Sequence, residues 1–135
     1  MTPTVAALTG FLAWALFLLV LMEAIRSKLV LQQQVPATAF DPGNSRQSPF
    51  MQRLARAHAN CIEGLPIFGG LMLVALVTGR TAITDPLAPV LLAARIVQST
   101  IHLCSVSSVA ITLRFAAFTV QMAIGAVWTV RLLAA

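Results

Sequence analysis

Charged residues are scarce in this sequence: they make up 10% of its 135 residues, whereas 59% are hydrophobic. A soluble domain normally carries about 25% charged residues, so this composition excludes a soluble globular protein. Acidic residues are the scarcest, with four against nine lysines and arginines. The net charge of +5 does not indicate nucleic-acid binding, because the basic residues stand beside apolar stretches, where they act as topology signals and lipid headgroup contacts.

Cysteines are equally few. Cys61 and Cys104 both fall within or beside apolar stretches, where a disulfide framework would have no small extracellular fold to cross-link. We therefore expect free thiols that pack as small apolar groups. The first apolar stretch, Val5–Met22, lacks a preceding basic segment and a small-residue cleavage pattern, and we interpret it as a membrane helix and not as a secretion signal.

Long apolar runs are what the sequence has instead. Residues 5–22, 64–79 and 115–130 are uncharged and mostly apolar, and 86–113 is apolar except for Arg95. A transmembrane helix needs roughly 20 residues to cross about 30 Å of hydrocarbon, so four crossings are expected to use most of the chain and leave no room for another domain. The predicted fold is an all-α integral membrane protein, one domain over 1–135 with a bundle of four transmembrane helices at about 5–27, 49–79, 86–107 and 112–133.

The helix boundaries follow from capping and turn signals. Segment 28–48 is the longest polar one and contains the turn-forming run Asp-Pro-Gly-Asn at 41–44, so we expect a loop there. Ser48-Pro49 and Asp85-Pro86 predict helix starts, because Ser and Asp cap helices and Pro favours the first helical position. The start of the last helix is marked only by a run rich in Ser and Thr, in which Thr112 is the candidate N-cap.

The basic residues are distributed asymmetrically. Five of the nine lie in or beside segment 28–48: Arg26, Lys28, Arg46, Arg53 and Arg56. By the positive-inside rule, this predicts that loop 28–48 is cytoplasmic and that both termini lie on the opposite side of the membrane. Glu23, near the inner end of the first helix, is expected to pair with Arg26 at the surface.

Polar residues at membrane depth are the strongest functional signal, because a charge there costs several kcal/mol unless it is paired or hydrated. Arg56, Asn60 and Glu63 share one face of the second predicted helix, and Arg95, Gln98 and His102 share one face of the third. In antiparallel helices rising about 1.5 Å per residue, Arg56 is then level with His102, Asn60 with Gln98, and Glu63 with Arg95. This registration predicts a polar cleft open to the cytoplasm, with a Glu63–Arg95 ion pair at its floor. The alternative is that Glu63 and Arg95 only neutralise each other's charge and hold the two helices in register.

The run RLARAHANCIEGLP at 53–66, followed by Ala-Arg at 94–95, resembles the membrane-associated proteins in eicosanoid and glutathione metabolism, a family that includes the microsomal glutathione transferases. The resemblance extends to length, number of spans and topology over nearly the whole chain. It implies a homotrimer of four-helix subunits, with glutathione bound between neighbouring subunits near the cytoplasmic face. The residues that match glutathione-binding positions of the family are Arg56, Asn60, Glu63 and Arg95. Gln98 and His102 complete the candidate binding site.

The chemistry of glutathione agrees with this implication. Its two carboxylates call for guanidinium groups, its ammonium for a carboxylate, and its thiol for a nearby positive charge. The family's thiol-activating arginine follows the short loop before the last helix, and Arg114 is the candidate for that catalytic role here. Ala59 stands where eicosanoid-forming members carry a further arginine, and His102 where many members have a tyrosine. These differences favour transferase or peroxidase activity over eicosanoid synthesis.

The sequence therefore predicts a glutathione-dependent transferase or peroxidase, with glutathione as co-substrate and no metal site. Its substrates would be lipophilic electrophiles or lipid hydroperoxides that reach the site from the bilayer. In an alternative interpretation the protein has the same fold but no catalytic activity, and it is a lipid-binding protein or an accessory subunit of a membrane complex. A third hypothesis is a small multidrug transporter, but such transporters centre on a carboxylate in their first helix, whereas the deep acid here, Glu63, is in the second.

Overall fold

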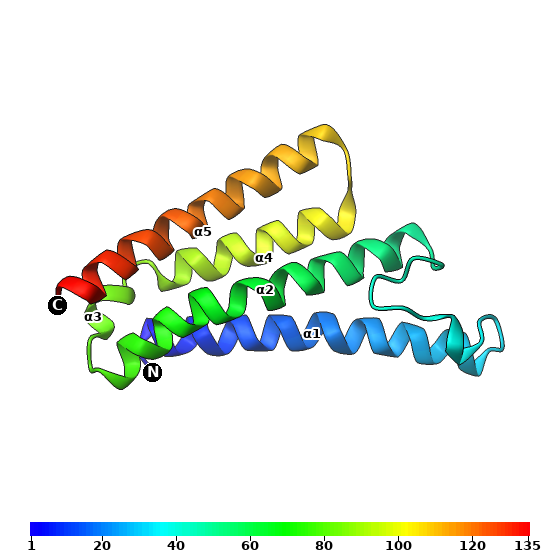
Figure 1. Ribbon diagram of the computed structural model, residues 1–135, viewed down its shortest axis with the longest axis horizontal. Coiled ribbons are helices and arrows are strands. Elements are labelled where there is room, and N and C mark those ends of the chain that lie inside the picture. Colours follow the sequence, from blue (N-terminus) through cyan, green and yellow to red (C-terminus); the bar gives the residue numbers. More distant parts are fainter.

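The chain folds into long helices that run side by side, described over residues 1–135 by a computed structural model (Figure 1). The elements in chain order are α1 (Pro3–Leu31), the 3-10 turn η1 (Ala37–Ala39), α2 (Pro49–Val77), α3 (Thr81–Thr84), α4 (Ala88–Cys104) and α5 (Ser108–Ala134). There are no strands, so the predicted all-α fold is confirmed. α1, α2 and α5 are long and apolar enough to cross a membrane, whereas α4 is apolar but has 17 residues.

Capping explains where the helices begin. The Thr2 hydroxyl accepts from the Val5 N–H before α1, and the Ser48 hydroxyl accepts from the Met51 N–H before α2, each at 3.2 Å. A proline occupies the first turn after each cap, as is common at helix starts. The predicted cap at Ser48 is thus confirmed.

Several predicted boundaries are displaced, and α1, for example, ends at Leu31 and not near residue 27. α5 begins at Ser108 and not after Thr112, because the Ser107 hydroxyl accepts from the Ala110 N–H at 3.2 Å and caps the helix earlier. α4 begins at Ala88, since the Asp85 carboxylate, the predicted cap, is bound to another helix. Asp85 instead stands directly after the short helix α3, which ends at Thr84.

The helices are packed so that both termini lie at one end of the bundle and the 32–48 loop lies at the other, together with the turn between α4 and α5 (Figure 1). α1 packs against α2 and α4, and α5 packs mainly on α4. α5 contacts α2 less and leans away from it toward Ser108 (Figure 1). The core between the helices is apolar, with Phe11, Leu18, Leu54 and Trp128 among its fully buried members.

Large apolar side chains also cover the outside of the helices. Leu16, Phe17, Ile67, Val97 and Phe115 are among many that are exposed. A soluble protein rarely leaves such a surface uncovered, whereas hydrocarbon solvates it without cost. The outer surface therefore suits a lipid environment.

A hydrogen-bonded cluster closes the end of the bundle that holds the termini. Asp85 accepts from the backbone N–H and the hydroxyl of Thr4 at 3.0 and 2.6 Å, and the Thr4 hydroxyl also contacts that of Thr84 at 2.7 Å. The hydrogen bond from the Thr4 hydroxyl lowers the pKa of the Asp85 carboxyl from its usual value. This cluster ties the start of α1 to the segment that leads into α4.

At the opposite end, Arg26 of α1 fastens the 32–48 loop. Its Nε and Nη2 donate to Asn44 Oδ1 at 3.0 and 2.5 Å, and Nη2 also donates to the Asp41 carbonyl at 3.0 Å. Asn44 is fully buried with φ of +53°, and its Nδ2 donates to the Met51 carbonyl in α2 at 2.9 Å. The expected Glu23–Arg26 pair is confirmed at 2.8 Å.

The turn that presents Asn44 is itself fixed by Asp41. The Asp41 carboxylate accepts from the backbone N–H and the hydroxyl of Ser45 at 2.8 and 3.0 Å. The backbone hydrogen bond is the main cause that lowers the pKa of Asp41 from its usual value. The loop predicted from the run at 41–44 is therefore an ordered turn.

Candidate functional site

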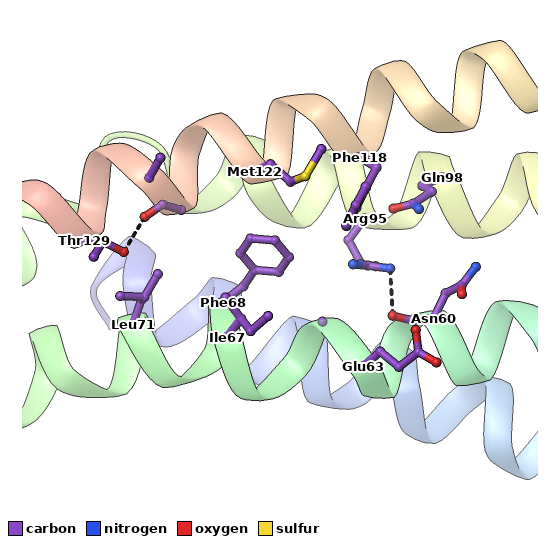
Figure 2. A pocket seen from close by; sticks show the side chains of 13 residues that line it. Asn60, Glu63, Ile67, Phe68, Leu71, Arg95, Gln98, Phe118, Met122 and Thr129 are labelled. Carbon is purple, nitrogen blue, oxygen red and sulfur yellow. Dashed lines mark hydrogen bonds between the residues drawn. The ribbon is translucent and has the colours of Figure 1, made fainter.

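A cleft of about 650 Å³ opens between α2 and α5, with α4 behind it (Figure 2). Four of the predicted site residues line it: Asn60, Glu63, Arg95 and Gln98. The remainder of the wall is largely apolar and includes Ile67, Phe68, Leu71, Phe118 and Met122. Its volume is in the range of small-molecule sites. The cleft therefore joins a polar end to a long apolar wall.

Arg95 is the most deeply buried charged residue, with 1% of its surface exposed. Its Nη1 donates to the Asn60 carbonyl at 3.3 Å (Figure 2). Its guanidinium also lies 5.4 Å from the centre of the Phe11 ring. Its Nε and Nη2 have no hydrogen-bond partner. A charged donor without a partner at this depth is costly, and Arg95 therefore has unused hydrogen-bonding capacity.

Gly64 makes this position of Arg95 possible. A Cβ at Gly64 would stand 2.5 Å from Arg95 Nη2, so any other residue there would displace the guanidinium. Arg95 therefore lies against the backbone of α2. The predicted Glu63–Arg95 ion pair is wrong within the chain, because the guanidinium is drawn to the Asn60 carbonyl beside Gly64 while Glu63 is on the exposed side of α2.

The opposed polar faces of α2 and α4 meet close to the predicted register, because Asn60 contacts both His102 and Arg95, but the side-chain partners differ from those predicted. Asn60 Nδ2 lies 3.4 Å from His102 Nδ1, and not opposite Gln98. Gln98 instead accepts at 2.9 Å from the side-chain amide of Gln121 on α5. The prediction considered only the faces of α2 and α4, whereas the partner of Gln98 is on α5.

Arg56 and His102 line a smaller hollow of about 270 Å³ beside the cleft, together with Arg53. Arg53 donates to the Leu103 carbonyl at 2.9 Å and so fastens the end of α4 to α2. Arg56 is exposed and makes no hydrogen bond, and it also lines a hollow of about 440 Å³ under the 41–45 turn. Because Asn60 touches His102, the two arginines adjoin the polar end of the main cleft.

Arg114 does not line the cleft. Since α5 begins at Ser108, Arg114 stands in the second turn, so the expected position in the first turn, at the positive end of the helix, is wrong. Its side chain is partly buried, and its Nε has no partner.

Sequence reasoning missed two residues of this region. Gln121 is fully buried, and its amide also donates to the Ala117 carbonyl at 3.1 Å while its Oε1 has no partner. The signal was present, since Gln121 is an amide in the middle of an otherwise apolar span. Gly64 was the other, because a lone glycine in a helix gives no sign of the side chain that needs its space.

The two cysteines are free thiols, with Cys61 buried and Cys104 exposed. No three His, Cys, Asp or Glu side chains come together in a way that would hold a metal ion. The chemistry of the region is therefore carried by its arginines, its amides and Glu63.

Comparison with known proteins places these features in a family. No curated protein and no solved structure matches the chain. The model of the MAPEG family matches residues 4–134, nearly the whole chain. This match agrees with the resemblance carried by the run at 53–66 and with the apolar helices of the fold. The chain is thus an integral membrane protein that belongs to the MAPEG family, a family associated with glutathione and eicosanoid metabolism.

Proposed function

We propose that this protein binds glutathione and directs its thiol onto lipophilic electrophiles or lipid hydroperoxides, as a membrane-embedded transferase or peroxidase. One observation carries the proposal: an acid, an amide and a partly unpartnered guanidinium share one cleft with a long apolar wall. A polar thiol peptide and an apolar chain both have suitable surfaces there. Family membership supports the choice of glutathione as the thiol.

The binding roles follow from charge. The exposed Glu63 carboxylate suits the glutathione ammonium, and Arg56, which has no hydrogen bond of its own, suits a carboxylate. Arg95 adds two free donors at the inner end of the cleft. The full set that we assign to glutathione is Arg56, Asn60, Glu63, Arg95, Gln98 and His102.

The exposure of Glu63 and Arg56 also supports a homotrimer. Both are charged, and both would face hydrocarbon or a hydrated groove on a single subunit in a bilayer. A neighbouring subunit that covers this face of α2 would bury the charges with their ligand. We therefore propose that glutathione is bound between subunits, as the family resemblance implies.

Arg114 is our candidate for activating the thiol. An unperturbed thiol titrates near 8.5, so a transferase must stabilise the thiolate, and each pKa unit requires about 1.4 kcal/mol. Arg114 is partly buried and has an unpartnered Nε. Its place in the second turn of α5 leaves this task to the guanidinium alone, because the helix dipole acts mainly within the first turn.

A second candidate function is a non-catalytic lipid-binding or accessory subunit with the same fold. It is favoured by the position of Arg114 outside the cleft, which leaves the candidate site without a catalytic residue on the chain itself. Under this alternative, glutathione would bind without being turned over, or would not bind.

Calorimetric titration of the detergent-solubilised protein with glutathione tests the proposal. We expect saturable heat at millimolar thiol, lost in Glu63→Gln and retained in Arg114→Ala. The ultraviolet absorbance of bound thiolate and conjugation of a model electrophile should disappear in Arg114→Ala and persist in the control Arg131→Ala, at the far end of α5. Absence of binding heat would contradict the proposal, and binding without a thiolate signal in the unaltered protein would favour the accessory subunit.

We also propose an orientation in the membrane, based on the basic residues around the 32–48 loop. The loop is assigned to the cytoplasm, and both termini lie on the other side. Gly43 suits a labelling test, because it is exposed and has room for a side chain, whereas the neighbouring Asn44 is buried. In a background without Cys61 and Cys104, Gly43→Cys should resist an impermeant maleimide in intact cells and react after lysis. Labelling in intact cells would invert the topology.

A further inference from the structure

A pair of buried amides joins α4 to α5 beside the main cleft. Gln121 on α5 is fully buried, and Gln98 on α4 is 9% exposed and lines the cleft (Figure 2). Gln121 Nε2 donates to Gln98 Oε1 at 2.9 Å. A hydrogen bond between two amides can form in either direction, because each amide carries an acceptor oxygen and a donor nitrogen. The direction therefore decides which group Gln98 turns toward the cleft.

The backbone of α5 fixes the direction of this bond. Gln121 Nε2 also donates to the Ala117 carbonyl at 3.1 Å, one helical turn earlier. A carbonyl oxygen only accepts hydrogen bonds, so the reverse orientation of the Gln121 amide would set two oxygens against each other. Both N–H groups of the Gln121 amide are thereby committed, one to Ala117 and one to Gln98. Gln98 must then offer its oxygen to Gln121.

The other half of the Gln98 amide is its nitrogen. Gln98 Nε2 makes no hydrogen bond within the chain, and it is not enclosed as Gln121 Oε1 is, because Gln98 lines the cleft. Its two N–H groups are therefore open to a ligand. These groups can donate to an oxygen but cannot accept from an ammonium, so they restrict which part of glutathione can lie beside them.

We infer that Gln121 is a positioning residue, which holds the Gln98 amide with its N–H groups toward the cleft, so that Gln98 donates to a carboxylate or peptide carbonyl oxygen of glutathione. The inference rests on the proposed function for the identity of the ligand. Gln121 itself does not line the cleft, and it acts only through Gln98. Without this partner, the Gln98 amide is free to turn its oxygen toward the cleft, where that oxygen would repel an oxygen of the ligand.

The orientation is tested first without a ligand, by NMR spectroscopy of detergent-solubilised protein with isotope-labelled glutamine side chains. Gln98→Leu identifies the signals of one amide, and Gln98→Leu/Gln121→Leu identifies those of the other. We expect the Gln98 N–H protons to exchange with water about tenfold faster than those of Gln121, because only the Gln98 protons face the cleft. Equal protection of the two amides, or stronger protection of Gln98, would overturn the inference.

Glutathione is then added to the same samples. The Gln98 N–H signals should move downfield as they donate to the ligand, and the Gln121 signals should stay, since its N–H groups are already engaged. Unmoved Gln98 signals in a protein that binds glutathione in calorimetry would overturn the inference and leave the proposed function standing. Absence of glutathione binding would remove the proposed function and the ligand contact with it. The exchange measurement would still keep or remove the role of Gln121 in orienting the amide.

Calorimetry on variants separates positioning from a general loss of structure. Gln121→Leu should weaken glutathione binding about tenfold, or about 1.4 kcal/mol, because the bound ligand would then leave the Gln98 oxygen stranded against leucine. In a Gln98→Leu background the same change should have no further effect, because the amide that Gln121 positions is absent. Equal weakening in both backgrounds would show a general structural effect and would overturn the inference.

Thr119→Val is the matched control on the same helix. The Thr119 hydroxyl donates to the Phe115 carbonyl at 2.8 Å, a bond to the preceding turn like the one from Gln121 to Ala117. Thr119 is exposed and does not line the cleft. Its replacement should leave glutathione affinity unchanged. Weakening equal to that in Gln121→Leu would overturn the inference, because the effect would then belong to α5 as a whole.

Discussion

Two arginines in this protein have opposite environments, the half-buried Arg26 and the buried Arg95. Arg26 makes four hydrogen bonds, to Glu23, to Asn44 through two nitrogens and to the Asp41 carbonyl, and it also lies 5.5 Å from the centre of the Phe40 ring. Arg95 is buried more deeply but makes one hydrogen bond, at 3.3 Å, and has two nitrogens without partners. Local sequence predicts only part of this difference, since Glu23 stands three residues before Arg26, whereas the contacts with Asp41 and Asn44 depend on how the loop folds.

The difference separates structure from function. A side chain whose donors are all engaged contributes to stability, because its removal leaves buried acceptors unpaired. A buried cation with free donors contributes little or costs stability, and it is maintained for what it binds. Arg26 is therefore the arginine that fastens the loop end, and Arg95 is the one with free donors in the cleft, as the proposed binding site requires.

The largest expected effect tests this contrast directly. Arg26→Gln should lower the free energy of unfolding by about 3 kcal/mol, because it leaves the buried Asn44 side chain without its charged donor. Arg95→Gln, although at the more buried position, should cost less than half as much. Melting of both variants in detergent, followed by the helical circular dichroism signal, gives the comparison. A larger loss for Arg95→Gln would remove the distinction.

The Gln98–Gln121 pair sharpens the contrast, because it is a neutral buried contact inside the functional region. Gln121→Leu should destabilise the protein by about 2 kcal/mol, since it strands the Gln98 carbonyl oxygen. The double variant Gln98→Leu/Gln121→Leu should recover most of this loss, because neither partner is left unpaired. Additive losses in the same melting assay would show that the two amides do not act as a pair.

The sequence was sufficient for the all-α fold and for four of the residues that line the cleft, but not for the contacts that these residues make. Apolar runs and the Ser48-Pro49 signal predicted the helices, and the 3.6-residue spacing placed Asn60, Glu63, Arg95 and Gln98 together. The pairing failed because Gly64 lets Arg95 reach the backbone, a close approach that no spacing rule describes.

The predictions for the loop and for the start of the last helix were incomplete or wrong for a related reason. Asn44 was recognised as a turn residue, but its burial depends on Arg26, eighteen positions away, and on the Met51 carbonyl. The start of α5 depended on which of several Ser and Thr residues captured the free N–H groups of the helix, and Ser107 did so before Thr112. Such choices are made by packing between helices, which a single sequence does not specify.

A smaller effect is expected where the predicted ion pair was wrong. Glu63→Gln should change the free energy of unfolding by no more than about 0.5 kcal/mol, because Glu63 is exposed and has no cationic partner in the chain. Its effect should add to that of Arg95→Gln, since residues without a shared contact behave independently. A coupling above about 1 kcal/mol in the double variant would indicate that the two side chains pair in the membrane after all.

The smallest effect concerns Asp85, which ties Thr4 of α1 to the segment before α4, at the end of the bundle that holds the termini. Its pKa in the folded chain is below the usual 3.8, chiefly because the Thr4 hydroxyl donates to it. A carboxyl with a lowered folded pKa stabilises the fold above its unfolded pKa, and this stabilisation is lost as the pH falls through the folded value. Asp85→Asn should therefore melt below the unaltered protein at pH 7, by at most about 2 °C for such an exposed group. The difference should shrink below about pH 4, where Asp85 becomes protonated. Thr4→Val removes the main cause of the shift but keeps the backbone N–H that also donates to Asp85, so in that background the Asp85→Asn difference at pH 7 should become smaller. A difference that stays constant from pH 7 to pH 3 would assign the effect of Asp85 to its shape and not to its charge.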